Sequence, residues 1–265
     1  MTLDLMRYES RNRLRGTFVL AVLLGLFALL MIALFPSVAE SGADFEAYIE
    51  SLPPSVREGF GVSGADITTM EGFLSTEFYQ FVWLLLLGLY VTYTAGGIVA
   101  SDIENGRMDL LLAAPISRAQ VLLEKFLSLL TTVVVLNLLM PLFVYGGAIL
   151  IEESIDATGL VAVHLLSIPY LLVCGAFGTL LSVTIHRADV ARRGGIGALF
   201  VLFVLEAVTT GTDFEWLGLL SPTHYYDPTE ILVEESYDLV GAAILIVATV
   251  VLLAASRVIF ERVDV

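Results

Sequence analysis

Long runs of apolar residues alternate with short polar segments along the whole chain. A helix needs about 17 to 25 residues to cross the roughly 30 Å of bilayer hydrocarbon, and six runs reach that length. The fifth run is the shortest of them. We therefore predict six membrane-spanning helices, over residues 17–35, 78–99, 126–149, 159–183, 195–211 and 238–256.

The composition supports an integral membrane protein. Apolar residues fill 57% of the 265 positions, against roughly 45 to 50% in a soluble domain, and the mean hydropathy is +0.88. Four arginines precede the first run and no small-residue cleavage site follows it, so we expect this helix to remain as an anchor. No linker or soluble domain is visible, which predicts one all-α membrane domain over residues 1–265.

Basic residues gather on one side of the predicted membrane. Six crossings place both termini on the same side, and each of the 13 Lys and Arg residues except Arg57 falls there. Because Lys and Arg near helix ends resist translocation, that side is predicted to be cytoplasmic and the protein to be a multi-pass protein of the plasma membrane. Topology alone explains these small basic clusters, so we expect no nucleic-acid partner.

The acidic residues gather mostly on the outer side and bring the net charge to −15. A highly charged acidic surface with arginine strongly preferred over lysine is typical of halophilic proteins, and a GC-rich genome would produce a similar arginine bias. Cys174 is the only cysteine, so neither an intrachain disulfide nor a cysteine metal cluster is expected.

An external insert is predicted over residues 36–77. Its stretch DFEAYIESL is followed by two prolines, which stop a helix, and then by a glycine-rich turn. Thr68 and Glu71 match a capping box. We therefore predict a helix that begins near Thr69 and continues into the second crossing.

A charged segment interrupts the apolar pattern on the predicted cytoplasmic side. The second crossing should end near Ala100, where Asn105 followed by glycine permits a sharp turn. After the turn, three apolar residues have the spacing of one helix face and predict a short surface helix: Met108, Leu111 and Leu112. Pro115 should end this helix, because the residue before a proline is disfavoured in helical geometry.

The next helix has several start signals. Ser117 is the predicted N-cap, Gln120 would close a capping box, and Ile116 would pack on Val121 as a hydrophobic staple. This helix continues into the third crossing, so a force on the surface helix would reach two spanning helices through one proline turn. The alternative is a plain interfacial loop.

This segment resembles the permease subunits of ABC transporters of the ABC-2 exporter type. The family commonly shows an acid-rich, glycine-containing segment after the second crossing, then two leucines, a proline turn and a lysine. The matching residues are Asp102, Glu104, Gly106, Asp109, Leu111, Leu112, Pro115, Ile116, Ser117, Arg118 and Lys125. The stretch LSPTHYYDP, residues 220–228, is similar to the family's external segment. Arg107 departs from the pattern, because many relatives carry threonine there.

The resemblance implies that residues 101–117 are a coupling helix and hinge that docks on a separate cytoplasmic ATPase. Glu104, Arg107, Asp109 and Arg118 would pair with a polar groove of that ATPase. Met108, Leu111 and Leu112 would fill the groove or face lipid. Residues 1–15 would form an elbow segment beside the ATPase, with a frayed basic tail as the alternative.

The resemblance also implies partners. The sequence contains no G-x-x-x-x-G-K-[ST] phosphate loop, so this chain is expected to be a transport subunit and not an enzyme. It would bind no cofactor, and ATP and Mg²⁺ would be held by the partner. The family's pathway forms between two permease subunits, which predicts a homodimer or a pair with a paralogous permease in the lipid bilayer.

The second crossing carries polar candidates for a transport pathway. Aromatic, hydroxyl and small residues recur there at helical spacing and would face the dimer axis or a neighbouring helix: Trp83, Leu87, Tyr90, Tyr93, Thr94 and Gly97. The alternative is an ordinary packing face with aromatic belt residues. Asn137, in the third crossing, is a further pathway candidate. We expect a hydrogen bond to another helix rather than to a substrate.

Glu206 is the one acid inside a predicted spanning run. An intramembrane carboxylate suggests a cation or proton site, but Glu206 lies about one turn from the outer boundary and could simply reach water. Residues 212–237 are broken by Gly218 and Pro222, which suits an external re-entrant helical hairpin like the family's. A loose external loop is the alternative.

ATP-driven export of a hydrophobic or amphipathic substrate is the main functional hypothesis. An intramembrane metalloprotease would need its acids and histidines within the membrane, but the Glu152-Glu153 and Glu234-Glu235 pairs fall outside it, and no metal site is predicted. A secondary transporter working without ATP often shows internal repeats, and none is evident in this sequence.

Overall fold

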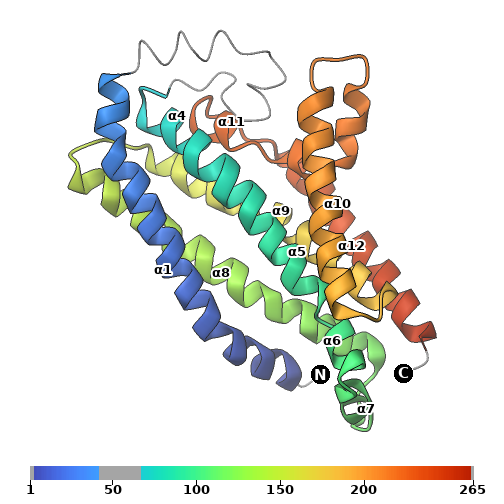
Figure 1. Ribbon diagram of the computed structural model, residues 1–265. Helices are drawn as coiled ribbons and strands as arrows, with labels where there is room; N and C mark the ends of the chain where they lie inside the picture. The colour runs from blue at the N-terminus through green and yellow to red at the C-terminus, as the bar shows by residue number, and fades with distance from the viewer. Residues whose placement is uncertain (1–2, 42–66, 264–265) are drawn as a thin grey trace.

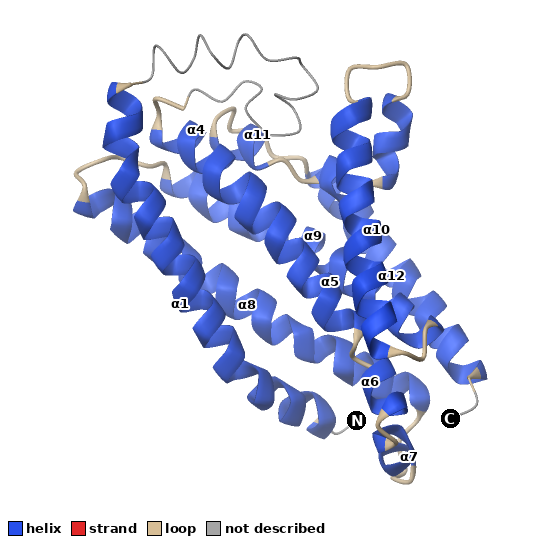
Figure 2. Ribbon diagram, viewed as in Figure 1, coloured by secondary structure: helices blue, strands red, loops and turns tan. Residues whose placement is uncertain are grey.

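A computed structural model describes residues 3–41 and 67–263, and these residues contain helices and no strand (Figure 2). Five elements precede the turn at Asn105 and Gly106: α1 (Asp4–Glu40), α4 (Met70–Leu74), the π-helix η1 (Ser75–Leu87), α5 (Gly88–Gly96) and α6 (Ala100–Glu104). The remaining elements are α7 (Arg107–Leu112), α8 (Arg118–Leu150), α9 (Ala157–Thr184), α10 (Ala188–Thr209), η2 (Glu215–Leu220), η3 (Pro222–Tyr225), α11 (Pro228–Leu232) and α12 (Leu239–Arg262).

Within the described residues, five helical stretches are long and apolar enough to cross a membrane. They are α1, the stretch from α4 to α6, α8, α9 and α12. The fifth predicted run forms α10, which carries Arg192, Arg193 and Glu206 among its 22 residues. The multi-pass helical membrane fold is therefore confirmed, whereas the sixth crossing stays a prediction.

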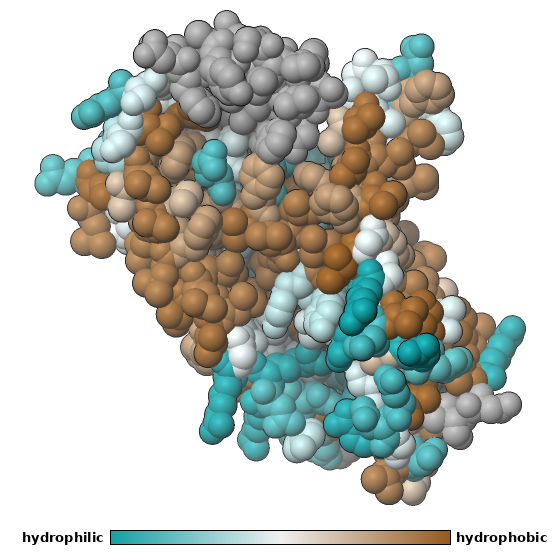
Figure 3. Space-filling view, in the orientation of Figure 1, coloured by the Kyte–Doolittle hydropathy of each residue, from teal (hydrophilic) through white to brown (hydrophobic). Residues whose placement is uncertain are grey.

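The helices pack as an elongated bundle (Figure 1). α1 lies along α8, α5 packs between α9 and α10, and α12 packs on α9 and α8. Both chain ends lie at the same end of the molecule as α6 and α7, and α4 and α11 lie at the other. Figure 3 shows hydrophobic side chains over the middle of this face and hydrophilic ones gathered toward the α6–α7 end.

α1 is longer than predicted at both ends. It begins at Asp4, so the predicted elbow is not a separate element, and it continues through Pro36 to Glu40. Packing outweighs the hydrogen bond lost at the proline, because Phe35 is buried with its ring 5.7 Å from that of Phe73. Residues 42–66 of the predicted 36–77 insert lie outside the described residues.

Two predicted capping boxes form only in part. The hydroxyl of Thr69, and not that of Thr68, accepts a bond from the Gly72 N–H at 3.1 Å and caps α4. Glu71 instead accepts a bond from the N–H of Asp156, the N-cap of α9, at 3.0 Å. Ser117 is confirmed as the α8 cap, since its Oγ accepts from the Gln120 N–H at 3.1 Å. The Gln120 side chain, however, donates to Glu124 and does not reach back to Ser117.

Candidate functional site

The junction between α5 and α6 is held against α9. The hydroxyl oxygen of Ser182 accepts hydrogen bonds from the N–H groups of Val99 and Ala100, both at 3.0 Å. These are among the first N–H groups of α6, which have no partner within the helix. The break after α5 is therefore stabilised by a neighbouring helix and has a defined geometry.

The chain reverses direction between α6 and α7. Gly106 has a φ of +66°, in the left-handed region that favours glycine. α7 follows immediately, so the predicted turn and short helix are confirmed and the alternative of a plain loop is excluded. α7 ends at Leu112, slightly before the predicted end, and Pro115 lies in the 113–116 connection that precedes the α8 cap.

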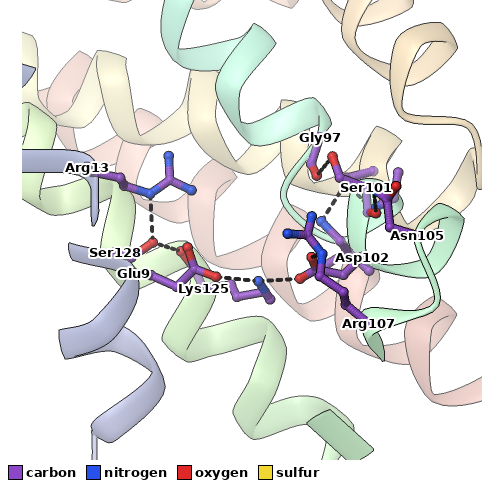
Figure 4. Close-up of polar contacts among 12 residues, drawn as sticks. Glu9, Arg13, Gly97, Ser101, Asp102, Asn105, Arg107, Lys125 and Ser128 are labelled. Atoms are coloured by element: carbon purple, nitrogen blue, oxygen red, sulfur yellow. Dashed lines mark hydrogen bonds and ion pairs between the residues drawn. The ribbon is translucent and has the colours of Figure 1, made fainter. Parts of the chain in front are cut away.

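A chain of four charged groups joins this turn to the rest of the bundle (Figure 4). The ammonium of Lys125 lies 2.6 Å from Oδ2 of Asp102 on α6 and 2.8 Å from Oε1 of Glu9 on α1. The other oxygen of Asp102 lies 3.0 Å from Nε of Arg107, at the start of α7. Through one lysine on α8, the ion pairs therefore link α1, α6, α7 and α8.

The charges of these four side chains cancel. Two carboxylates face two cations, and the Lys125 side chain is only 3% exposed. A buried ammonium needs such partners, because leaving water costs several kcal/mol per ion. Further polar contacts join α1 to α8. Arg13 Nε donates to Ser128 Oγ at 3.1 Å, and the hydroxyls of Thr17 and Thr132 lie 2.9 Å apart.

The α6–α7 segment is also bonded to α10. Oε2 of Glu104 accepts a hydrogen bond from the N–H of Ala188, at the first turn of α10, at 3.1 Å. The guanidinium of Arg192 donates to Ser101 Oγ at 3.1 Å and lies 5.3 Å from the ring of Tyr93. α6 is thus fixed to α10.

Arg118 connects the start of α8 to the end of α12. Its guanidinium donates to the carbonyl of Phe260 at 3.1 Å and to that of Val263, and lies 5.9 Å from the Phe260 ring. A cation at a helix C-terminus satisfies its free carbonyls. Nη1 of Arg118 is therefore used within the chain, and pairing of its other donors with a partner stays a prediction.

The apolar face of α7 points into the protein. Met108 is fully buried and packs in a cluster with Val121 and Phe260 from α8 and α12, and Leu111 and Leu112 lie against the same cluster. The expectation that Met108 fills a partner's groove or faces lipid is therefore wrong. The packing of the three residues explains instead why α7 holds a fixed orientation.

Leu110 is the residue that the sequence interpretation missed. It is 76% exposed and lies beside exposed Asp109 on the outer face of α7. Its position was readable from the sequence, because Met108, Leu111 and Leu112 occupy one helix face and Leu110 falls on the opposite one. An exposed leucine at the tip of the molecule is a candidate contact for another protein.

The predicted stripe on the second crossing does not form as expected. η1 is a π-helix, with i to i+5 hydrogen bonds, so the α-helical spacing fails over residues 75–87. Trp83 and Leu87 are buried in the core, whereas Tyr90 and Tyr93 are exposed and Thr94 is half-buried. Only the last three remain available to a pathway or to another chain.

Asn137 is used in contacts between helices. Its amide donates to the Val133 carbonyl at 2.8 Å, and its oxygen accepts a bond from Ser167 Oγ of α9 at 2.9 Å. The predicted bond to another helix is confirmed. The candidate role of Asn137 in the pathway is not supported, since the side chain is buried and both its ends are bonded.

Glu206 joins α10 to η3. Its Oε2 accepts a hydrogen bond from the hydroxyl of Thr223, and its Oε1 lies 3.6 Å from Nδ1 of His224. Thr223 is in turn bonded to Ser221 across 2.6 Å. These contacts hold α10 against η3, and the predicted proton or cation role of Glu206 stays a prediction.

The predicted re-entrant segment, residues 212–237, folds as the short helices η2, η3 and α11 and not as a two-helix hairpin. The hydroxyl of Tyr225 donates to the Leu219 carbonyl at 2.9 Å, which holds η3 on η2. Asp227 caps α11 by accepting from the Thr229 N–H at 2.7 Å. Burial raises the pKa of Asp227, and the N–H groups of Thr229 and Glu230 oppose that rise. Entry of this segment into the membrane stays a prediction.

Replacing Glu206 with glutamine is expected to lower the free energy of unfolding by roughly 1 to 2 kcal/mol. The variant keeps the shape of the side chain but loses the charge that faces Thr223 and His224. Thermal unfolding of the purified chain in lipid nanodiscs measures the change, with exposed Glu215→Gln as the control. If transport by the variant shows the wild-type pH profile, a proton or cation role for Glu206 is excluded.

Comparison with known proteins gives two matches. A family model described as "ABC-2 family transporter protein" matches residues 3–265. A protein of Bacillus subtilis (strain 168), described as "Uncharacterized protein YhcI", is 26% identical over 176 residues. That alignment covers 56% of this chain and 55% of the relative, so this chain matches about half of the relative's length.

Proposed function

The chain belongs to the ABC-2 family of transporter proteins, because that family's model matches residues 3–265, and we propose that it is the permease subunit that carries the coupling contact to an ABC ATPase. The observation that carries the proposal is the position of α7. It lies at the end of the molecule that holds both termini (Figure 1), with Leu110 exposed and its other face packed into the bundle.

The contacts of the α6–α7 segment suit the transmission of force. A displacement of α7 by a docked ATPase would pull on Arg107 and Asp102, and through Lys125 on α1 and α8. Glu104 would carry the same displacement to α10, and Arg118 to α12. Packed interfaces switch between discrete arrangements and do not deform continuously. These links would therefore move the helices together.

The ATPase partner would bind through the exposed face of α7. Leu110 would enter a hydrophobic depression, while Asp109 and the exposed part of Arg107 would pair with polar groups around it. The lack of a phosphate loop in this sequence supports a separate motor. ATP and Mg²⁺ would be held there, and this chain would not catalyse hydrolysis.

The transport cycle would move a hydrophobic or amphipathic substrate outward between two such permeases in the plasma membrane. α10 would serve as the sixth crossing, and both termini would be cytoplasmic, as the basic residues near the α6–α7 end indicate. A homodimer or a pair with a paralogous permease would supply the second half of the pathway. Tyr90, Tyr93 and Thr94 are the remaining candidates for contact with that second subunit or with substrate.

Copurification and transport together test this proposal. The chain is coexpressed with phosphate-loop ATPases encoded beside its gene, and inverted membrane vesicles are assayed for ATP-dependent uptake of a panel of hydrophobic compounds. We expect one ATPase to copurify, and uptake to be lost when the phosphate-loop lysine of that ATPase is replaced by alanine. Transport by the purified chain alone, without ATP, would contradict the proposal.

A further inference from the structure

Five buried side-chain polar atoms have no hydrogen-bond partner among the described residues, and three of them belong to side chains that contact one another. These three are the hydroxyl oxygen of Tyr79, Nε1 of Trp83 and Nε2 of His164. All three side chains are buried. Buried polar groups in native proteins are nearly always paired, with protein or with ordered water. Three unpaired atoms therefore require an explanation.

The three side chains lie together. The imidazole of His164 has its centroid 4.9 Å from the Trp83 ring and 5.4 Å from the Tyr79 ring, and both aromatic rings stand edge-on to it. Tyr79 and Trp83 come from η1, and His164 comes from α9. The unpaired atoms thus belong to one cluster at the contact between two helices.

Their hydrogen-bonding roles are complementary. Nδ1 of His164 lies 2.8 Å from the Leu160 carbonyl, which can only accept, so Nδ1 carries the hydrogen. In the neutral ring Nε2 is then an acceptor, whereas the indole N–H of Trp83 can only donate and the Tyr79 hydroxyl can do either. The cluster offers two donors and one acceptor that do not reach one another.

The spacing of Tyr79 and Trp83 explains how the cluster arises. Residues four apart lie close to one helical turn apart in an α-helix or a π-helix, so both side chains lie on the face of η1 that contacts His164. Stretches of π-helix are rare and occur frequently at functional sites. Here η1 presents two large side chains with polar groups to one histidine.

We propose that Tyr79, Trp83 and His164 form a binding site for one water molecule inside the bundle. The water oxygen accepts from the Trp83 N–H and the Tyr79 hydroxyl, and one water hydrogen is donated to Nε2 of His164. A buried water typically makes about three hydrogen bonds, so one molecule satisfies all three atoms. This inference is independent of the ATPase partner, and either can fail without the other.

The water adds a polar link between the second crossing and α9. Two direct links flank the same contact: the Tyr170 hydroxyl donates to the Leu84 carbonyl at 2.9 Å, and Thr92 Oγ1 donates to the Cys174 carbonyl at 3.1 Å. A water can exchange partners when helices shift, whereas a direct bond must break. The site therefore joins η1 to α9 without locking one against the other.

The substitution Tyr79→Phe tests the site by the sign of its effect. With water bound, loss of the hydroxyl removes a hydrogen bond and lowers the Tm of the full chain in nanodiscs by about 2 to 4 °C. In a dry cluster, the same change removes an unpaired buried hydroxyl and leaves the Tm unchanged or raises it, which would overturn the proposal. Tyr170→Phe, which removes a hydroxyl with a known partner, is the matched control and should lower the Tm.

The indole of Trp83 provides a second readout that needs no change at the site. The sequence contains two tryptophans, so the exposed Trp216 is replaced by phenylalanine and the ultraviolet resonance Raman spectrum of Trp83 is recorded. We expect the band of a hydrogen-bonded N–H. The band of a free N–H refutes the site, as does a high-resolution structure with Nε1 of Trp83 directly bonded to Nε2 of His164.

Discussion

Replacing Lys125 with methionine is expected to lower the free energy of unfolding by roughly 3 kcal/mol, the lower end of the range for breaking a buried ion pair. Methionine fills a similar volume, but Asp102 and Glu9 then face each other with no ammonium between them. The lower end applies because Glu9 remains 24% exposed and retains part of its hydration. Denaturant titration of the purified chain in mixed micelles measures the loss.

Loss of Lys125 should also uncouple the two activities of the complex. α7 would still dock, but its displacement would no longer pass to α1 and α8. We expect the ATPase to copurify normally and to hydrolyse ATP, while substrate transport falls by about tenfold or more, which corresponds to about 1.4 kcal/mol of lost coupling.

Two variants serve as controls for this prediction. Asp102→Asn combined with Lys125→Met removes charges of both signs and should recover part of the stability, because the more deeply buried carboxylate is gone and only the partly exposed Glu9 faces the apolar side chain. Arg193→Ala breaks an exposed pair with Asp189 at 3.9 Å and should change stability by less than about 0.5 kcal/mol. A Lys125→Met variant as stable as the wild type would show that the ion chain contributes little.

Replacing Leu110 with glutamate is expected to weaken ATPase binding by more than about tenfold, since loss of a central apolar anchor costs over 1 kcal/mol at protein interfaces. The side chain is 76% exposed, so the change adds a charge in water and should leave the Tm unaltered. Binding of the detergent-solubilised permease to immobilised ATPase measures the affinity, and stimulated ATP hydrolysis confirms it.

Leu150 is the matched control for Leu110. It is 79% exposed and ends α8, at the opposite end of the molecule from α7. Leu150→Glu should therefore bind the ATPase as the wild type does. Equal binding by both glutamate variants would show that the exposed face of α7 is not the docking surface.

Several elements could be predicted from the sequence because their causes are local. The apolar runs require helices wherever backbone groups leave water. Ser117 caps α8 through a bond that spans three residues, and Gly106 turns the chain through its own backbone freedom. The acid-rich turn with its two leucines and proline also led to the family that the comparison confirms.

Other features could not be predicted because they depend on residues far apart in the sequence. The partners of Lys125 lie at positions 9 and 102, and Arg118 reaches the carbonyl of Phe260. Met108 follows helical periodicity perfectly well, yet periodicity does not say whether its face meets the protein, lipid or a partner. The π-helix escaped prediction because an apolar run has no local signal for i to i+5 bonding.

By itself, then, the sequence determined which apolar stretches form long helices, where the chain turns and to which family it belongs, since these follow from hydrophobicity, capping and local motifs. Only the tertiary structure decided which side of α7 is free, which charges cancel around Lys125 and which polar atoms remain unpaired at Tyr79, Trp83 and His164. The reason is physical: desolvation makes a buried charge or polar group depend on the neighbours that folding brings to it.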